Sequence, residues 1–136
     1  MDQDEAANDG AFRGPITVRL LPGKGRGVLT TRAVAEGERL CSDACVMLTP
    51  DDCRKLEETS FHGHYFAHPE VEGEGCVVLG PTSLVNHGGP APNCRLEWAD
   101  TPHAGWVVRL LARRPLAAGE ELTIDYACPL WFDPAP

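Results

Sequence analysis

The stretch from Leu84 to Cys94, L-V-N-H-G-G-P-A-P-N-C, contains residue types that can build a small-molecule site. An apolar lead-in is followed by the pair Asn86-His87 and by a turn rich in Gly and Pro. A polar pair held between a buried segment and a tight turn keeps its amide, imidazole and backbone groups in defined positions, which ligand binding requires. Taken alone, this composition is equally typical of an ordinary polar loop, because Gly and Pro mark loops of every kind.

A glycine-rich segment, Gly23 to Gly27 (G-K-G-R-G), is a second place where the backbone can approach a ligand. Glycine allows this close approach and also adopts positive φ. A dinucleotide-binding fingerprint would need a long helix after the glycines, whereas a second strand is expected here, which excludes that interpretation. The alternative is a plain hairpin turn.

Tyr126 ends the segment G-E-E-L-T-I-D-Y, where a last strand is expected. A tyrosine hydroxyl at the end of a strand can orient a nucleophile or stabilise developing charge through a hydrogen bond. Tyrosines pack into cores more often than they act in catalysis, so this residue alone does not define a site.

Three histidines, His62, His64 and His68, surround Tyr65 and precede Glu70. An H-x-H pair followed by a carboxylate is similar to the metal sites of cupin barrels. The glutamate is farther away than that motif requires, and no later segment supplies the remaining histidine in the setting that the motif expects. We therefore predict no metal site and interpret these histidines as surface residues flanking a functional Tyr65.

The six cysteines contain no C-x-x-C pair and are irregularly spaced. A zinc ribbon is therefore unsupported. No secretory signal precedes them, since the N-terminal residues M-D-Q-D-E-A-A-N-D are acidic and lack an apolar segment. We expect buried free thiols and a cytoplasmic location, or a nuclear one if the source is eukaryotic or viral.

The composition indicates one ordinary globular domain of 136 residues, with 43% hydrophobic and 24% charged residues. No run of 18 apolar residues predicts a membrane span. The net charge is −8, which argues against a nucleic-acid surface and suits a basic protein partner, although acidity also simply favours solubility. Part of this charge belongs to residues 1–12, which we expect to form a mobile tail; a second short tail is expected at 133–136.

The elements that must position these residues are mostly short strands. Apolar and alternating runs separated by Gly/Pro turns predict strands at 16–21, 28–32, 39–48, 76–79, 94–98, 106–112 and 121–126. Thr49, Pro50 and two following acids predict a short helix to about Glu58. Residues 61–68 fit either strand or loop. The sequence thus predicts a mainly β fold with little helix and no internal repeat.

Taken together and in order, three segments resemble the SET-domain protein lysine methyltransferases. They are residues 23 to 40 (G-K-G-R-G-V-L-T-T-R-A-V-A-E-G-E-R-L), 86 to 94 (N-H-G-G-P-A-P-N-C) and 117 to 126 (A-A-G-E-E-L-T-I-D-Y). The resemblance extends over most of the chain, and we assign residues 13–132 to one SET domain. Its small size is similar to that of the compact stand-alone SET proteins of viruses and bacteria.

The resemblance implies a SET-domain fold of small curved β-sheets with a C-terminal pseudo-knot, which sequence patterning alone could not indicate. It implies S-adenosylmethionine as the cofactor. Its expected cofactor-binding residues are Lys24, Gly25, Arg26, Asn86 and His87, with Trp131 covering the cofactor after the last strand. Its expected catalytic residues are Tyr126 and, near the methyl-transfer channel, Tyr65.

The implied activity is methyl transfer to a lysine amine of a basic protein, such as a histone or histone-like protein. Alignment of amine, methyl and sulfur is an orientation effect, and a snug aromatic channel disfavours the charged amine by desolvation. The resemblance also allows a homodimer that completes the substrate groove. Two alternatives stay open: a non-catalytic SET-like peptide-binding module and a metal-dependent β-barrel enzyme.

The chain departs from the family's pattern in two places. The usual N-H-S-x-x-P-N is here N-H-G-G-P-A-P-N, so that Gly88 replaces the serine and one residue is inserted before Pro92. The cysteine-rich zinc segment that follows many SET domains is missing, since only Cys128 follows Cys94. The first departure affects the loop that the resemblance assigns to the cofactor.

Overall fold

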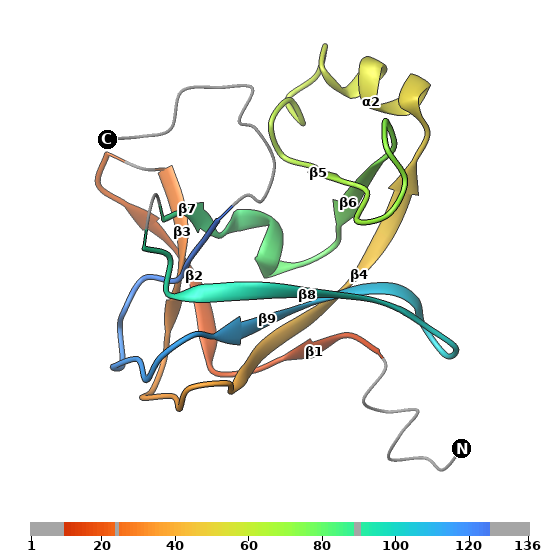
Figure 1. The fold of residues 1–136 in the computed structure, drawn as a ribbon. Helices are drawn as coiled ribbons and strands as arrows, with labels where there is room; N and C mark the ends of the chain where they lie inside the picture. The colour runs from red at the N-terminus through yellow and green to blue at the C-terminus, as the bar shows by residue number, and fades with distance from the viewer. Residues whose placement is uncertain (1–9, 24, 89–90, 126–136) are drawn as a thin grey trace.

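The computed structural model describes residues 10–23, 25–88 and 91–125. Its elements are short strands that form one larger sheet and two small ones (Figure 1). The six-stranded sheet has the order β5-β6-β4-β9-β8, and β1 pairs with β4 outside this path. The strands of this sheet are β1 (Phe12–Arg13), β4 (Arg39–Leu48), β5 (Phe66–Ala67), β6 (Gly75–Val78), β8 (Cys94–Thr101) and β9 (Gly105–Ala112).

The two small sheets contain two strands each. In the first, β2 (Ile16–Leu21) and β3 (Gly25–Thr30) form an antiparallel hairpin. In the second, β7 (Asn86–His87) and β10 (Thr123–Ile124) run parallel although 35 residues or more separate them in the chain. The predicted mainly β architecture with little helix is confirmed. No helix among the described residues is long and apolar enough to cross a membrane.

The one α-helix of the described residues, α2 (Pro50–Leu56), begins as its sequence predicts. Thr49 accepts a hydrogen bond from the backbone N–H of Asp52, and the Asp52 carboxylate accepts one from the backbone N–H of Thr49. This reciprocal capping box satisfies two N–H groups that a helix start otherwise leaves without partners. A 3₁₀ turn, η1 (Pro81–Leu84), leads directly towards β7, in agreement with the helical turn expected before Asn86.

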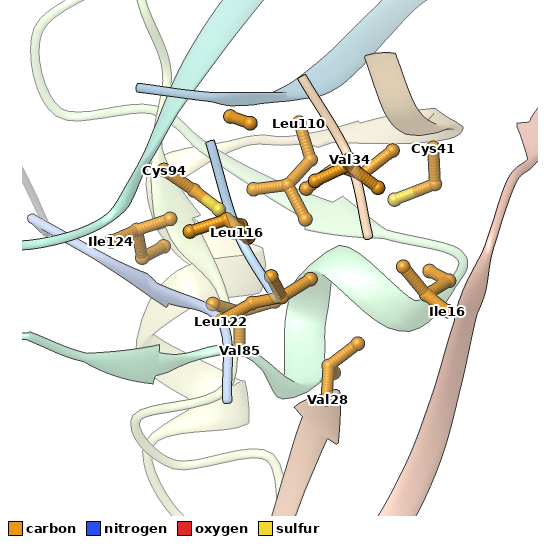
Figure 2. Packing of buried hydrophobic residues seen from close by; sticks show 12 residues of the cluster. Ile16, Val28, Val34, Cys41, Val85, Cys94, Leu110, Leu116, Leu122 and Ile124 are labelled. Carbon is orange, nitrogen blue, oxygen red and sulfur yellow. The ribbon is translucent and has the colours of Figure 1, made fainter. Parts of the chain in front are cut away.

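The main core draws apolar side chains from all three sheets (Figure 2). Val28 comes from β3, Leu40 from β4, Leu110 from β9 and Ile124 from β10, and each is fully buried. Such burial contributes roughly 1.5–3 kcal/mol for each large apolar side chain. The small sheets are therefore fixed relative to the large one by a shared core, which places β3 and β7 reproducibly.

Two turns of the fold are copies of each other, which the sequence reading missed. Residues 32–38 (R-A-V-A-E-G-E) and 114–120 (R-P-L-A-A-G-E) each end in a glutamate that accepts from the arginine at their start, with N···O distances of 2.7 and 2.6 Å. The two turns also pair through Val34 and Leu116, whose backbone groups exchange hydrogen bonds of 3.0 Å. A repeat of seven residues that differ at their central positions is too short to recognise from the sequence alone, before the common geometry of the two turns is known.

Apart from β8, which extends to Thr101 rather than to the expected residue 98, two strands differ by more than one residue from their predicted boundaries. The strand expected at 28–32 is β3 (Gly25–Thr30), which begins three residues earlier because Gly25 already pairs with Leu21 of β2. The strand expected at 121–126 is reduced within the described residues to β10, two residues long. Ladder pairing, rather than the apolar pattern, decides both limits. Tyr126 and the expected pseudo-knot beyond it lie outside the described residues.

Candidate functional site

Three segments far apart in the chain meet at the side chain of Asn86. Its amide nitrogen Nδ2 donates to the backbone carbonyl of Arg26 at 3.2 Å and to Oε2 of Glu121 at 2.7 Å. Arg26 lies in β3, Asn86 begins β7, and Glu121 lies two residues before β10. The structure therefore brings together two of the residues that the sequence assigned to the cofactor, and it adds Glu121, which the sequence reading had not selected.

The parallel pairing of β7 and β10 sets the position of the Asn-His pair. Asn86 lies opposite Thr123 and His87 opposite Ile124, and the N–H of Gly88 donates to the carbonyl of Ile124 at 2.8 Å. Both members of the pair are half-buried. The chain that leads to Tyr126 thus runs directly beside Asn86 and His87.

The glycine-rich segment meets this region through its hairpin. Gly23 and Gly25 have φ values of 74° and 73°, which L-residues rarely adopt, so both positions require glycine for conformation. A Cβ atom at Gly25 would meet nothing within 4 Å, so the backbone is open on that side. Lys24, between them, lies outside the described residues.

Gly27 has a different reason to be glycine. It is buried, and a Cβ atom there would lie 2.3 Å from Cδ1 of Leu21 and 3.0 Å from Oε2 of Glu121. The bare backbone therefore leaves room for the Glu121 carboxylate beside β3. The spacing of the glycines suggests a turn, and only the folded chain shows that this one accommodates an acid from 94 residues later.

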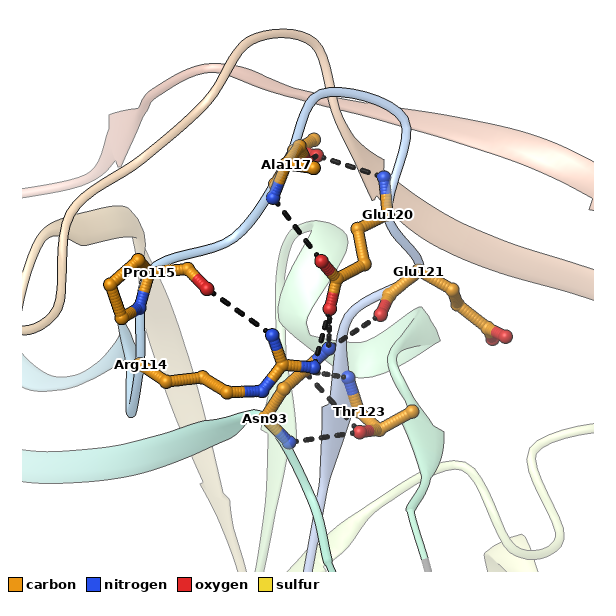
Figure 3. Close-up of polar contacts among 8 residues, drawn as sticks. Asn93, Arg114, Pro115, Ala117, Glu120, Glu121 and Thr123 are labelled. Atoms are coloured by element: carbon orange, nitrogen blue, oxygen red, sulfur yellow. Dashed lines mark hydrogen bonds and ion pairs between the residues drawn. The ribbon is translucent and has the colours of Figure 1, made fainter.

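Asn93 anchors the other end of the loop that follows Asn86 and His87 (Figure 3). Its Oδ1 accepts from the backbone N–H of Thr123 at 2.8 Å, and its Nδ2 donates to the carbonyl of Glu121, also at 2.8 Å. The backbone N–H of Asn93 donates to Oγ1 of Thr123 at 3.1 Å. Asn93 is buried, and sequence reading had noted it only as part of a motif. Its paired bonds hold the segment before β10 against the start of β8.

The Glu120 carboxylate also belongs to this hydrogen-bond network and connects Asn93 to the turn at 114–120. It forms an ion pair with Arg114 at 2.6 Å and accepts from the backbone N–H of Ala117 at 3.2 Å and from Nδ2 of Asn93 at 3.3 Å. The hydrogen bond from Arg114 is the largest cause that lowers the pKa of Glu120. The adjacent carboxylates thus have different partners: Glu120 contacts Arg114 and Ala117 of the turn at 114–120, and Glu121 contacts Asn86.

Tyr65 lies immediately before β5, and its hydroxyl donates to the carboxylate of Glu57, the residue that caps α2. Burial, followed by the neighbouring Glu57, raises the pKa of Tyr65, so its phenol stays protonated. In Figure 1, α2 and β5 lie on the opposite side of the upper half of the molecule from β3 and β7. Tyr65, next to β5 and hydrogen-bonded to the end of α2, therefore lies apart from the Arg26–Asn86 contact.

The histidines near Tyr65 have separate partners. His62 contacts the Glu57 carboxylate, whereas His68 accepts at Nδ1 from the backbone N–H groups of Glu70 and Val71, both at 3.0 Å. In the part of the chain that the structure describes, no group of three or more His, Cys, Asp or Glu residues is placed to hold a metal ion.

Five of the six cysteines lie in the described ranges, and all five are free thiols. Cys41, Cys76 and Cys94 are buried, as expected, whereas Cys45 and Cys53 are half-buried. Cys128 lies outside the described residues, as do Tyr126 and Trp131, so the expected roles of these last two stay predictions.

Comparison with known proteins identifies the family. The SET domain family model matches residues 25–127, which contain β3, Asn86, Glu121 and nearly the whole fold. The chain belongs to the SET domain family. This confirms the resemblance of the three sequence segments and the predicted SET-domain fold.

Individual relatives agree with this assignment. A histone-lysine N-methyltransferase of Schizosaccharomyces pombe, specific for H3 lysine-37, is 28% identical over 127 residues, which cover 90% of this chain and 80% of the relative. A candidate histone methyltransferase of Plasmodium falciparum has a similar structure, with a TM-score of 0.68 and 18% identity over 88% of this chain and 99% of its own. A chain of Polycomb Repressive Complex 2 of Chaetomium thermophilum, solved as a humanized mutant bound to the inhibitor GSK126, has a TM-score of 0.67 and 21% identity; the match covers 85% of this chain and 15% of that one.

Proposed function

We propose that this protein transfers a methyl group from S-adenosylmethionine to a lysine side-chain amine of a basic protein, such as a histone or histone-like protein. One observation carries the proposal: the SET-family match spans the segments that meet at Asn86. The curated relative named a histone-lysine N-methyltransferase supports the same reaction class.

The residues at the site fit this cofactor. The backbone at Gly25 is open, and the Asn86 carboxamide has an oxygen besides the two donors that it uses within the protein. The nearby Glu121 carboxylate favours a cationic ligand. We propose that Lys24, Gly25 and Arg26 bind mainly through their backbone, Asn86 and His87 bind from β7, and Trp131 covers the ligand.

When bound, S-adenosylmethionine supplies an electrophilic methyl group on a sulfonium. The chain's part is to orient a neutral lysine amine in line with that methyl group, an orientation effect. We propose that Tyr126 holds the reacting groups through its hydroxyl and that Tyr65 lines the lysine channel. Glu57 fixes the Tyr65 hydroxyl as a donor, and an aromatic wall disfavours the charged amine by desolvation.

The net charge of −8 supports a basic substrate, because an acidic surface attracts Lys- and Arg-rich chains. We propose the cytoplasm of a bacterium, or the nucleus of another source, as the place where the protein meets such a substrate.

The test is label transfer from methyl-tritiated S-adenosylmethionine to core histones and to basic bacterial proteins, followed by identification of methyl-lysine. We expect label on lysine, and a loss of roughly a hundredfold in rate for Tyr126→Phe, which removes one stabilising hydroxyl. Absence of transfer by the wild-type protein would contradict the proposal. Peptide binding without any calorimetric response to S-adenosylhomocysteine would instead favour a non-catalytic binding module.

A further inference from the structure

The Glu121 carboxylate accepts a hydrogen bond of 2.7 Å from Nδ2 of Asn86, a residue of the proposed cofactor site. We propose that Glu121 is a positioning residue, which orients the Asn86 carboxamide so that its oxygen Oδ1 accepts from the α-ammonium group of the cofactor. This inference rests on the proposed function and adds a role for Glu121, a residue of the third motif segment to which the resemblance assigned none.

The orientation follows from the hydrogen-bond inventory of a carboxamide. An asparagine side chain has two N–H donors on Nδ2 and a carbonyl acceptor, Oδ1. Nδ2 of Asn86 makes two bonds, to the carbonyl of Arg26 and to Oε2 of Glu121, and both partners can only accept. A carboxamide turned by 180° would place Oδ1 against these two oxygens. The amide is therefore held with Nδ2 inward, and Oδ1 is left as the group that it offers to a ligand.

The backbone holds Glu121 in place for this contact. Glu121 bridges to Leu29 of β3, and the N–H of the next residue, Leu122, donates to the carbonyl of Val28 at 2.8 Å. Gly27 of β3 has no side chain and therefore leaves space for the Glu121 carboxylate beside this strand. Leu122 is fully buried, which anchors the segment. The acid is thus positioned before any ligand arrives, which reduces the cost of ordering the site on binding.

An acceptor oxygen beside a carboxylate selects for a donating cation. The amino-acid end of S-adenosylmethionine carries an ammonium and a carboxylate, and only the ammonium can donate to Oδ1. The negative charge of Glu121 also favours the ammonium and disfavours the carboxylate at this position. Glu121 thus sets which end of that zwitterion faces Asn86.

The experiment compares two ligands by calorimetric titration: S-adenosylhomocysteine and its analogue without the α-amino group. In the wild type, the first is expected to bind more tightly. Glu121→Ala should weaken S-adenosylhomocysteine about tenfold, the scale of one hydrogen bond with a charged partner, and should change the deaminated analogue less than about twofold. Glu121→Asp retracts the carboxylate by one methylene but retains the charge, and should show a selective loss of the same kind that is smaller than that of Glu121→Ala.

Two further variants serve as controls. Glu121→Gln keeps an acceptor oxygen for Nδ2 and should retain S-adenosylhomocysteine binding within about threefold. Glu72→Ala removes an exposed acid from the loop between β5 and β6, away from β7, and should bind both ligands as the wild type does. Circular dichroism confirms that each variant is folded; if Glu121→Ala is not, Glu121→Asp gives the same comparison.

The outcomes separate the two proposals. Equal weakening of both ligands would assign Glu121 a merely structural role and overturn this inference, as would unchanged binding of S-adenosylhomocysteine. A wild-type protein that binds neither ligand would overturn the proposed function, and this inference with it.

Discussion

Gly88 lies directly against Thr123. A Cβ atom on residue 88 would come within 2.6 Å of Oγ1 and 2.7 Å of Cβ of Thr123, and within 2.8 Å of Cα of Pro92. No side chain fits there without movement of the loop or of β10. The replacement of the family's serine by glycine is therefore a steric requirement of this loop.

Adding a methyl group at this position should strain the β7–β10 pairing. We expect Gly88→Ala to lower the free energy of unfolding by about 1–3 kcal/mol, as overpacking does. Gly88→Ser, which restores the family's residue, should cost at least as much. Urea unfolding followed by circular dichroism measures both. Gly10→Ala is the matched control, since a Cβ atom there meets nothing within 4 Å; its effect should stay within about 0.5 kcal/mol. Equal stability of Gly88→Ser and wild type would contradict the steric explanation.

Asn93 is expected to be the most sensitive polar residue of this region. Asn93→Ala removes the partners of the Thr123 N–H and of the Glu121 carbonyl, both in a buried or half-buried setting. Groups left without partners cost about 1–3 kcal/mol each, so we expect a loss of roughly 2–6 kcal/mol for the two. Thermal or urea unfolding measures it. A loss below about 0.5 kcal/mol would mean that water replaces the side chain.

Acid should weaken the two copied turns. Hydrogen bonds from Arg32 and Arg114 are the largest causes that lower the pKa of Glu38 and of Glu120, respectively. A carboxylate whose pKa is lower in the folded than in the unfolded chain stabilises the fold above its ordinary pKa, and this contribution is lost as the pH falls through the folded value.

The urea midpoint should therefore decrease as the pH is lowered from 7 through the usual glutamate range near 4.5 and below it. The double variant Glu38→Gln/Glu120→Gln should show a smaller decrease between pH 7 and pH 3 than the wild type does. If both proteins lose stability in parallel, the two turns do not contribute to acid sensitivity.

The buried thiols should resist modification. Burial is the main cause that raises the pKa of Cys41 and of Cys94 to about 12, so their thiolate is scarce at pH 8. The contact with Cys76 lowers the pKa of the half-buried Cys45. Iodoacetamide at pH 8, followed by peptide mass spectrometry, should label Cys45 before Cys41 and Cys94, whereas urea should make all three react alike. Rapid native labelling of Cys94 would contradict the closed packing of β8 against β10.

Much of the strand pattern could be predicted because it is local. β2, β4 and β9 follow apolar runs that end at Gly or Pro turns, and α2 follows its Thr49–Asp52 capping box. β10 could not be delimited in this way, because a strand of two residues exists only through its partner β7. The paired turns at 32–38 and 114–120 also became visible only when Val34 and Leu116 were seen to pair.

By itself, the sequence determined the mainly β architecture and the family resemblance, since periodicity, turn residues and motif order are properties of neighbouring residues. It also selected Arg26 and Asn86 as cofactor residues, by resemblance. The tertiary structure alone decided that these two meet, that the Glu121 carboxylate accepts from the Asn86 amide, and that Gly27 and Gly88 must lack side chains. These contacts join residues up to 94 positions apart, so the folded chain and its shared core, rather than any local pattern, place their atoms together.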